Sequence, residues 1–224
     1  MSLKKEFVAP ALPLPSDVYS RTESTELIRA LRLYFNTLDR YLASLNTIIN
    51  GGSGDTGITF PHIAASDTGD QYAGGDDTPT AVSWDTLNSG YLWTLNAPGS
   101  ATAQVSGIYK ITYSLQFANT NNAQHDATCW LKVNNVDVPN STTTFTLQAR
   151  KNVGVPALNC GYSEAVFAMN AGDEVELYWA TEQAYESGIQ DGVYMFNDTA
   201  QTSPYARPSI PSAIGSIVWV SALT

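Results

Sequence analysis

The sequence predicts a mainly β protein, a sandwich or barrel of short strands, preceded by a single α-helix. After residue 57, apolar and polar residues alternate in several short stretches, which is typical of strands with one buried face. Turn-forming residues separate these stretches, since the chain contains 16 Gly and 11 Pro and is rich in Thr, Ser and Asn. Before them, from Ser20 to Asn50, no Gly or Pro interrupts the chain, so this segment can form one continuous helix.

The first 22 residues are predicted to form an extended strap. They contain the stretch APALPLP, in which Pro10, Pro13 and Pro15 favour a polyproline-like conformation without a core of its own. The same prolines interrupt the apolar run of this segment, so we expect no signal peptide there.

Residues 23–50 are predicted to form the helix. Ser20 and Glu23 have the spacing of a capping box, which marks a helix N-terminus. The stretch GGSGDTG, residues 51–57, follows as a flexible linker. The predicted β-domain occupies residues 58–224.

The apolar residues of the predicted helix form three adjacent columns. Alternate spacings of four and three residues make an unbroken heptad seam, and a further column recurs at every seventh residue. This surface is wider than the seam of a parallel dimer, so it favours a trimer or larger assembly, or a helix lying in a groove. Packing of the helix onto its own β-domain is the alternative. The predicted interface comprises Leu27, Ile28, Leu31, Tyr34, Phe35, Leu38, Tyr41, Leu42, Leu45, Ile48 and Ile49.

Strand-like alternation is clearest in GIYKITYSLQF, where the odd-numbered residues from Tyr109 to Phe117 are apolar and the even-numbered residues between them are polar. The stretch VNNVDV predicts a tight hairpin, because Asn135 adopts positive φ more readily than most residues. The same alternation recurs in YLWTL, CWLKV, TFTLQA and EVELYW.

The last predicted strand, AIGSIVWVSAL, is apolar on both of its sides. Ile214 and Val218 lie on one side, whereas Ile217 and Trp219 lie on the other. Such a strand needs cover on both faces, either from a second layer of its own domain or from another subunit. Ile217 and Trp219 are the predicted intersubunit residues.

Four motifs follow one another in the β-domain. They are the Gly-x-Tyr of Gly107 and Tyr109, Asn134 ahead of a turn, the Ala-Gly-Asp turn at 171–173, and a closing apolar strand. In this order they resemble the globular domain of the C1q and tumour necrosis factor (TNF) superfamily, over roughly residues 58–224. The resemblance implies a jelly-roll sandwich that assembles as a homotrimer.

The front of the chain carries a second resemblance. The stretch APALPLPSDVYSRTESTELIRALRLYFNTLDRYL, about residues 9–42, is similar to the N-terminal segment of certain tailed-bacteriophage virion proteins, with RALRLYFNTLD as its most specific part. It implies a viral structural protein made in the host bacterial cytoplasm and anchored to other virion proteins by its strap and helix. Together the resemblances imply a tail fibre, knob or head decoration that displays a C1q-like, TNF-like jelly roll on the virion, with the helix as a coiled coil or a docking helix.

The net charge limits the classes of partner that we expect, and the cysteine positions predict how the two thiols are used. The net charge of −10 repels phosphate backbones and anionic lipid headgroups, so we expect neither nucleic acid nor a membrane surface as a partner. We also expect no membrane insertion, because no segment approaches the apolar length of a span. Cys129 falls in step with Leu131 and Val133 and is predicted to be a small buried apolar residue, with a bridge to Cys160 as the alternative.

The sequence contains no recognisable catalytic or cofactor-binding motif. His62 and His125 lack the spacing of a zinc site, and no nucleophile elbow, phosphate loop or dinucleotide fingerprint is present. We therefore predict a protein that is not an enzyme and has no cofactor. A Ca²⁺ ion in a Gly-rich acidic loop is the alternative, with Asp67, Asp70, Asp76 and Asp77 as the carboxylates.

A second functional hypothesis is a receptor-binding, lectin-like module that recognises host surface glycans. Residues 181–209 combine acidic side chains with aromatic rings, and rings stack on the C–H faces of sugars while carboxylates accept hydroxyl protons. Tyr185 and Tyr194 are the predicted glycan contacts. A third hypothesis is a glycan hydrolase on the same scaffold, since paired carboxylates perform glycoside hydrolysis.

Overall fold

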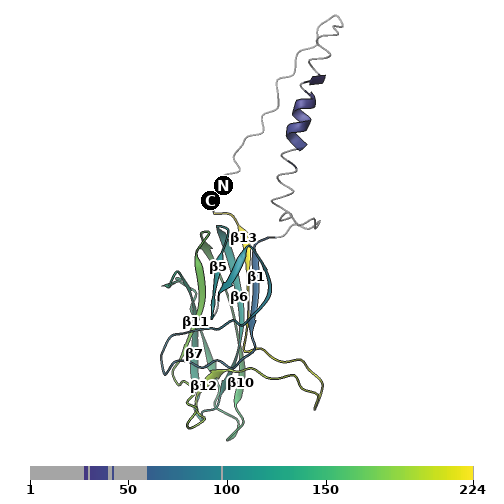
Figure 1. Ribbon diagram of the computed structural model, residues 1–224. Coiled ribbons are helices and arrows are strands. Elements are labelled where there is room, and N and C mark those ends of the chain that lie inside the picture. Colours follow the sequence, from purple (N-terminus) through teal and green to yellow (C-terminus); the bar gives the residue numbers. More distant parts are fainter. Residues whose placement is uncertain (1–27, 30, 40–41, 43–59, 97, 224) are drawn as a thin grey trace, which may run out of the picture. The chain divides into compact units, whose positions relative to one another are not determined.

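The computed structural model describes residues 28–29, 31–39, 42, 60–96 and 98–223. The described residues before position 43 are all helical, and they fall inside the predicted helix, whose remaining residues lie outside the described part. The strap and the linker lie outside it as well. Residues Phe60–Thr224 form a separate compact unit built from strands (Figure 1).

The β-unit is a sandwich of two antiparallel sheets, so the mainly β prediction is confirmed. The first sheet has the order β10 (Ala157–Met169), β6 (Gly107–Asn119), β13 (Ala213–Ser221), β1 (His62–Asp67), β3 (Thr86–Tyr91), with β12 (Val193–Met195) paired to β6. The second has the order β4 (Trp93–Asn96), β5 (Ser100–Ala103), β11 (Glu174–Thr181), β7 (His125–Val133), β8 (Val136–Asp137), with β2 (Thr80–Ala81) on β11 and β9 (Thr143–Leu147) on β7.

The core lies between the sheets and is filled by the residues that the alternation predicts. In β6 every second residue from Tyr109 to Phe117 is buried, and the residues between them are only partly covered. In β11, Val175, Leu177 and Trp179 are buried in the same way from the other sheet. Because side chains alternate across a strand, these two strands supply opposite walls of one apolar interior.

The β7–β8 hairpin confirms the prediction from VNNVDV. Val133 pairs with Val136, and the two residues between them, Asn134 and Asn135, have φ of 50° and 63°. Positive φ at both central positions belongs to the turn whose twist matches that of the flanking strands.

The side of β13 that lies open is the opposite of the one predicted. Ile217 is 6% exposed and belongs to the core, and Trp219 packs against that core and stacks on Phe60 with ring centroids 5.7 Å apart. Ile214 and Val218 point away from the second sheet and are almost half exposed. The sequence shows two apolar sides, but only the pairing register decides which one the second sheet covers.

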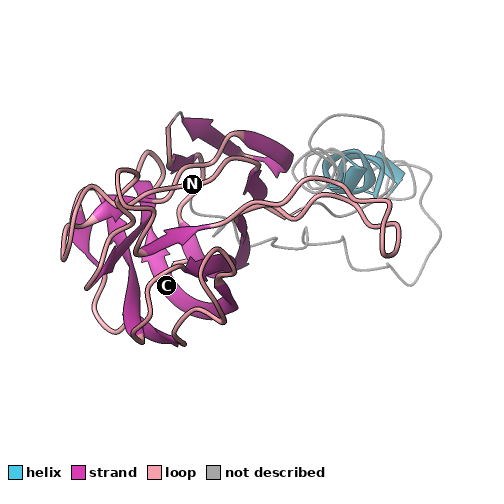
Figure 2. Cartoon of the chain, turned by 90° about the horizontal axis from the view of Figure 1, so that it is seen from below, coloured by secondary structure: helices cyan, strands magenta, loops and turns pink. Residues whose placement is uncertain are grey.

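Different residues lie at the two ends of the sandwich, which are marked by the two ends of β6. Phe60, the first residue of the β-unit, stacks on Trp219 beside the start of β6. At the other end of β6, Asn119 pairs with Val193 of β12. The segment between β12 and β13 forms a long loop that projects from the sandwich (Figures 1 and 2), and an ion pair between Asp198 and Arg207 ties its two arms together.

Candidate functional site

Three tyrosine rings gather beside β12, far from Phe60 along the sandwich. The ring centroids of Tyr72 and Tyr194 lie 5.5 Å apart at an interplanar angle of 21°, so these rings are stacked. Tyr185 lies 5.3 Å from Tyr72 and 5.0 Å from Tyr194. Phe196 meets Tyr194 edge-on at 6.3 Å. We call Tyr72, Tyr185 and Tyr194 the tyrosine cluster.

Backbone hydrogen bonds to β12 fix the cluster. Gln71 and Met195 exchange two such bonds, each of 2.9 Å, which places Tyr72 beside Tyr194. The amide of Tyr185 donates to the carbonyl of Val193 at 3.0 Å. Each ring is therefore attached to a paired backbone segment, and the cluster is held by the sheet on the side of β12 away from β6.

The carboxylate of Asp70 lies next to the ring of Tyr72. Asp70 Oδ1 accepts the backbone amide of Asn197 at 2.8 Å, and the Tyr72 hydroxyl lies 3.4 Å from Asp70 Oδ2. Burial raises the pKa of Tyr194 to about 12, and burial followed by the charge of Asp70 raises the pKa of Tyr72. Both hydroxyls are therefore neutral hydrogen-bond donors and acceptors at any physiological pH.

The cluster joins the two predicted glycan residues to others that were not predicted. Tyr185 and Tyr194 come from the segment identified in the sequence, and the structure brings them together. Tyr72 and Asp70 come from the Gly-rich acidic loop, for which the sequence predicts only a Ca²⁺ site. Tyr72 was discoverable as an aromatic residue among carboxylates, but nothing in the sequence predicts the pairing of Gln71 with Met195.

The carboxylates of that loop are dispersed among separate hydrogen bonds. Asp67 accepts the amide of Gly69, and Asp76 accepts the amide of Ala184. Within the described residues, no three His, Cys, Asp or Glu side chains converge in an arrangement that could hold a metal ion. The geometry of the loop thus serves to fold it against its neighbours.

A second candidate surface is the outward side of β6, β10 and β13, which we call the open face. Its apolar side chains include Tyr162 and Val166 of β10, which are 60% and 63% exposed. Ile214 and Val218 of β13 extend this surface across β6. A hollow of about 150 Å³ lies between Tyr162 and Ile214.

The polar groups of the open face are paired with one another. Lys110 Nζ lies 2.6 Å from Glu164 Oε2, and these two are the charged residues at the outward positions of β6, β10 and β13. Thr112 and Ser216 share a hydrogen bond of 2.8 Å. Cys160 Sγ lies 3.1 Å from Ser114 Oγ. Because the two charges balance each other, covering this face would leave no isolated ion.

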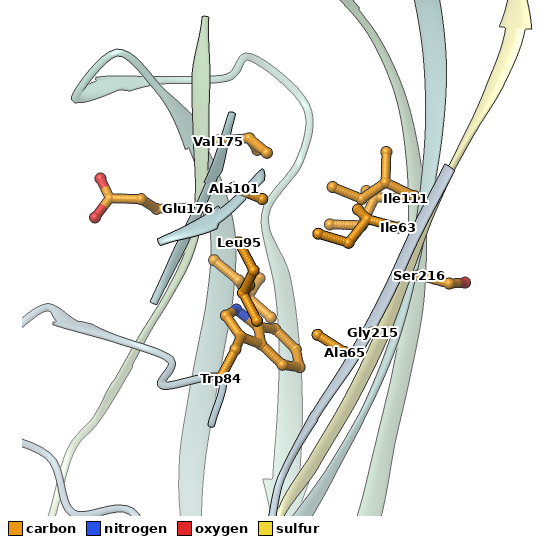
Figure 3. Close-up of a pocket in the computed structure, with 12 residues that line it drawn as sticks. Ile63, Ala65, Trp84, Leu95, Ala101, Ile111, Val175, Glu176, Gly215 and Ser216 are labelled. Carbon is orange, nitrogen blue, oxygen red and sulfur yellow. The ribbon is translucent and has the colours of Figure 1, made fainter. Parts of the chain in front are cut away.

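The interior also contains a small cavity between the sheets (Figure 3). Trp84 and Leu95 line it from one side, and Ile63 and Ile111 from the other, whereas Glu176 and Ser216 point away from it. Its volume is about 40 Å³. A cavity this small and this apolar holds no polar ligand, so it is a packing feature and not a binding site.

The predicted helix interface is only partly described. Leu31, Tyr34 and Leu38 of the heptad seam are half-buried within the chain. Ile28, Phe35 and Leu42 of the neighbouring column are exposed. Leu27, Tyr41, Leu45, Ile48 and Ile49 lie outside the described residues.

The two cysteines are unpaired, so the alternative of a bridge is excluded. Cys129 is buried in the core, as predicted, and Cys160 is exposed on the open face.

In the described part of the chain, no helix has the length and apolar character needed to cross a membrane. No protein family model matches the sequence, and a comparison with curated proteins finds no relative.

Proposed function

We propose that this protein is a non-enzymatic structural component of a bacteriophage virion, a tail fibre, knob or head decoration, that displays a homotrimeric C1q-like jelly roll. In this proposal the N-terminal strap and helix bind other virion proteins and help to join three chains. The virion part of the proposal rests on the resemblance of about residues 9–42 to phage virion proteins. The trimer part is supported by the open face.

The path of the chain supports the jelly roll. From β5 onward the chain passes repeatedly between the sheets: β5, β7, β9 and β11 belong to the second sheet, and β6, β10 and β13 to the first. The chain therefore crosses the core between β5 and β6, β6 and β7, β9 and β10, β10 and β11, and β11 and β12. Hydrogen-bonded neighbours such as β6 and β13 are distant in sequence. This crossing pattern is what two interleaved Greek keys produce.

The open face is the observation that supports trimer formation. Large apolar patches exposed on a soluble protein mark interaction surfaces. On the open face, Tyr162 and Ile214 flank Ser114 of β6, and Val166 and Val218 flank Lys110, so apolar side chains border the polar row of β6 on both sides. Here Tyr162, Val166, Ile214 and Val218 are exposed together, and the Lys110–Glu164 pair supplies its own counter-charge. Burial of this face against copies of itself would remove the apolar side chains from water without isolating a charge.

The proposal is tested by mass and by location. The full chain should elute with a molar mass three times the 24.1 kDa of the monomer in light scattering coupled to size-exclusion chromatography. Immunogold labelling of purified phage particles should place it on their surface. A monomer at micromolar concentration would refute the trimer, and absence of the chain from the particles would refute the virion role.

A further inference from the structure

We infer that the tyrosine cluster, with Asp70 beside it, is a binding platform for a neutral carbohydrate, on which a sugar ring stacks against the outer face of Tyr72. This goes beyond the proposed display role and does not depend on trimer formation.

The spacing of the rings decides what the cluster can hold. The three centroids lie 5.0 to 5.5 Å apart, which is contact distance between aromatic rings. A cage for a trimethylammonium group needs rings separated widely enough to admit the cation between them. Since these rings fill the space between themselves, a ligand must lie on their outer surface, and a flat ring face favours a stacking ligand over an enclosed cation.

Tyr72 provides that outer surface. It is 48% exposed although it stacks on Tyr194, so its ring is supported from within and open outside. Tyr185 and Tyr194 are partly covered and hold it in place. A ring fixed by its neighbours loses little conformational entropy when a ligand stacks on it, and this favours binding to a weakly interacting partner such as a sugar.

Asp70 supplies the polar group that a sugar requires. Its Oδ1 atom is held by the amide of Asn197, so the carboxylate is oriented before any ligand arrives. The bond from Tyr72 to Oδ2 is long, at 3.4 Å, which leaves Oδ2 able to accept a stronger hydrogen bond from a ligand hydroxyl. Stacking and a charge-assisted hydrogen bond therefore converge at the edge of one ring.

The negative charge around the cluster favours a neutral ligand. The chain carries a net charge of −10, and the carboxylates of Asp70 and Asp76 bond to the segments that carry Tyr72 and Tyr185. A uronic or sialic acid would be repelled by this field, whereas a neutral hexose or N-acetylhexosamine would not. The acidic surroundings thus select within the class of carbohydrates.

The position of the cluster suits recognition of an external ligand. β6 spans the sandwich from Gly107, beneath Trp219 and near Phe60, to Asn119, which pairs with β12. Phe60 is where the β-unit joins the N-terminal part of the chain. β12, which carries Tyr194, lies at the opposite end of the sandwich (Figure 1), so the rings of the cluster are presented away from Phe60.

The experiment uses the full-length protein on an array of immobilised neutral oligosaccharides of glucose, galactose, mannose and N-acetylhexosamines, with sialylated and uronate-containing oligosaccharides and choline as comparison ligands. We expect binding to at least one neutral glycan and none to the acidic glycans or choline. Tyr72→Ala should weaken the binding about tenfold, the effect of losing one aromatic stacking partner. Tyr72→Phe keeps the stacking surface and should bind within about threefold of the wild type.

The matched control is Tyr205→Ala, which removes a 67% exposed tyrosine from the projecting loop outside the cluster. It should leave glycan binding unchanged. The inference is overturned if no neutral glycan binds, if acidic glycans bind better, or if Tyr205→Ala weakens binding as much as Tyr72→Ala. It is also overturned if Tyr72→Ala changes the molar mass, because the ring would then belong to a subunit contact. The trimer is measured separately, so either proposal can fail alone.

Discussion

The indole of Trp219 covers Gly107 so closely that a Cβ atom at position 107 would lie 2.3 Å from Trp219 Nε1. The glycine of the Gly-x-Tyr motif is therefore required by the closing strand β13, which pairs antiparallel with the start of β6 and places its tryptophan over the glycine. Phe60 stacks on the same indole at an interplanar angle of 7°. Three residues that are far apart in the chain thus close this end of the sandwich.

Gly107→Ala should destabilise the protein, because the added methyl group forces the Trp219 ring to move. Inserting a methyl group into a closely packed position costs roughly 1–3 kcal/mol, and we expect about 2 kcal/mol here. The measurement is urea-induced unfolding followed by tryptophan fluorescence.

Gly188→Ala is the matched control, since a Cβ atom there would meet nothing within 4 Å. We expect its free energy of unfolding to lie within about 0.5 kcal/mol of the wild type. Equal effects at positions 107 and 188 would contradict the steric explanation.

The sequence predicts those strands whose buried side is made of large apolar residues. β6 and β11 can be identified in the sequence because large apolar residues recur at every second position. Tyr113 and Leu115 are examples in β6, and Leu177 is an example in β11. β10 is as long as β6 but escaped prediction, because its inward positions include Gly161 and small residues. A Cβ atom at Gly161 would lie 3.0 Å from both Phe117 and Phe145, so rings from other strands fill the space that β10 leaves.

The candidate site was predictable only in part, for a different reason. Tyr185 and Tyr194 belong to one segment with an evident aromatic and acidic composition. Asp70 and Asn197 bond across 127 positions, and Tyr72 reaches the cluster through the same long-range pairing. Contacts of this kind depend on the sheet register, which composition does not encode.

Stability should fall as the pH rises above about 9, because buried groups hold their protons more tightly in the folded chain. Burial raises the pKa of Cys129 to about 12 and that of Tyr109 to about 12. In the unfolded chain these groups lose their protons near pH 8.5 and about 10, so their contribution is complete below those values and is lost as the pH rises toward 12. Urea unfolding across this range measures the effect.

Cys129→Ala separates the contribution of the thiol to this pH dependence from that of the tyrosines. The variant should be less stable at neutral pH, since it loses a buried sulfur atom, but its stability should begin to decline only above about pH 10. A decline from about pH 9 with the same slope as the wild type would show that another group is responsible.

If the open face joins the subunits of the proposed trimer, Ile214→Asp should convert it into monomers. Ile214 is exposed in the single chain, so the change leaves the fold intact, but burying a carboxylate among apolar side chains of the open face costs several kcal/mol. Light scattering should report the mass of one chain. Cys160 on the same face should then react faster with a thiol reagent, because the neighbouring subunits no longer cover it.

Val136→Asp is the control for this change. Val136 is 68% exposed in the β7–β8 hairpin of the other sheet, so its substitution should alter neither the mass nor the thiol reaction rate. If Ile214→Asp keeps the wild-type mass, the open face is not the subunit contact.

Leu38→Glu tests whether the helix contributes to the same assembly. Leu38 lies in the heptad seam and is half-buried within its own chain. If three seams meet, three carboxylates would face one another in an apolar contact, and the association constant should fall by roughly tenfold or more. Analytical ultracentrifugation over a range of concentrations measures this constant.

Asn36→Glu adds the same charge to an exposed position outside the seam and should leave the association constant unchanged. A trimer of normal stability in Leu38→Glu would mean that the β-domains associate without the helix and that the seam packs against another protein or against its own β-domain. If the seam binds another virion protein, the variant should still form trimers but should no longer attach to the particle, and labelling of assembled virions tests this.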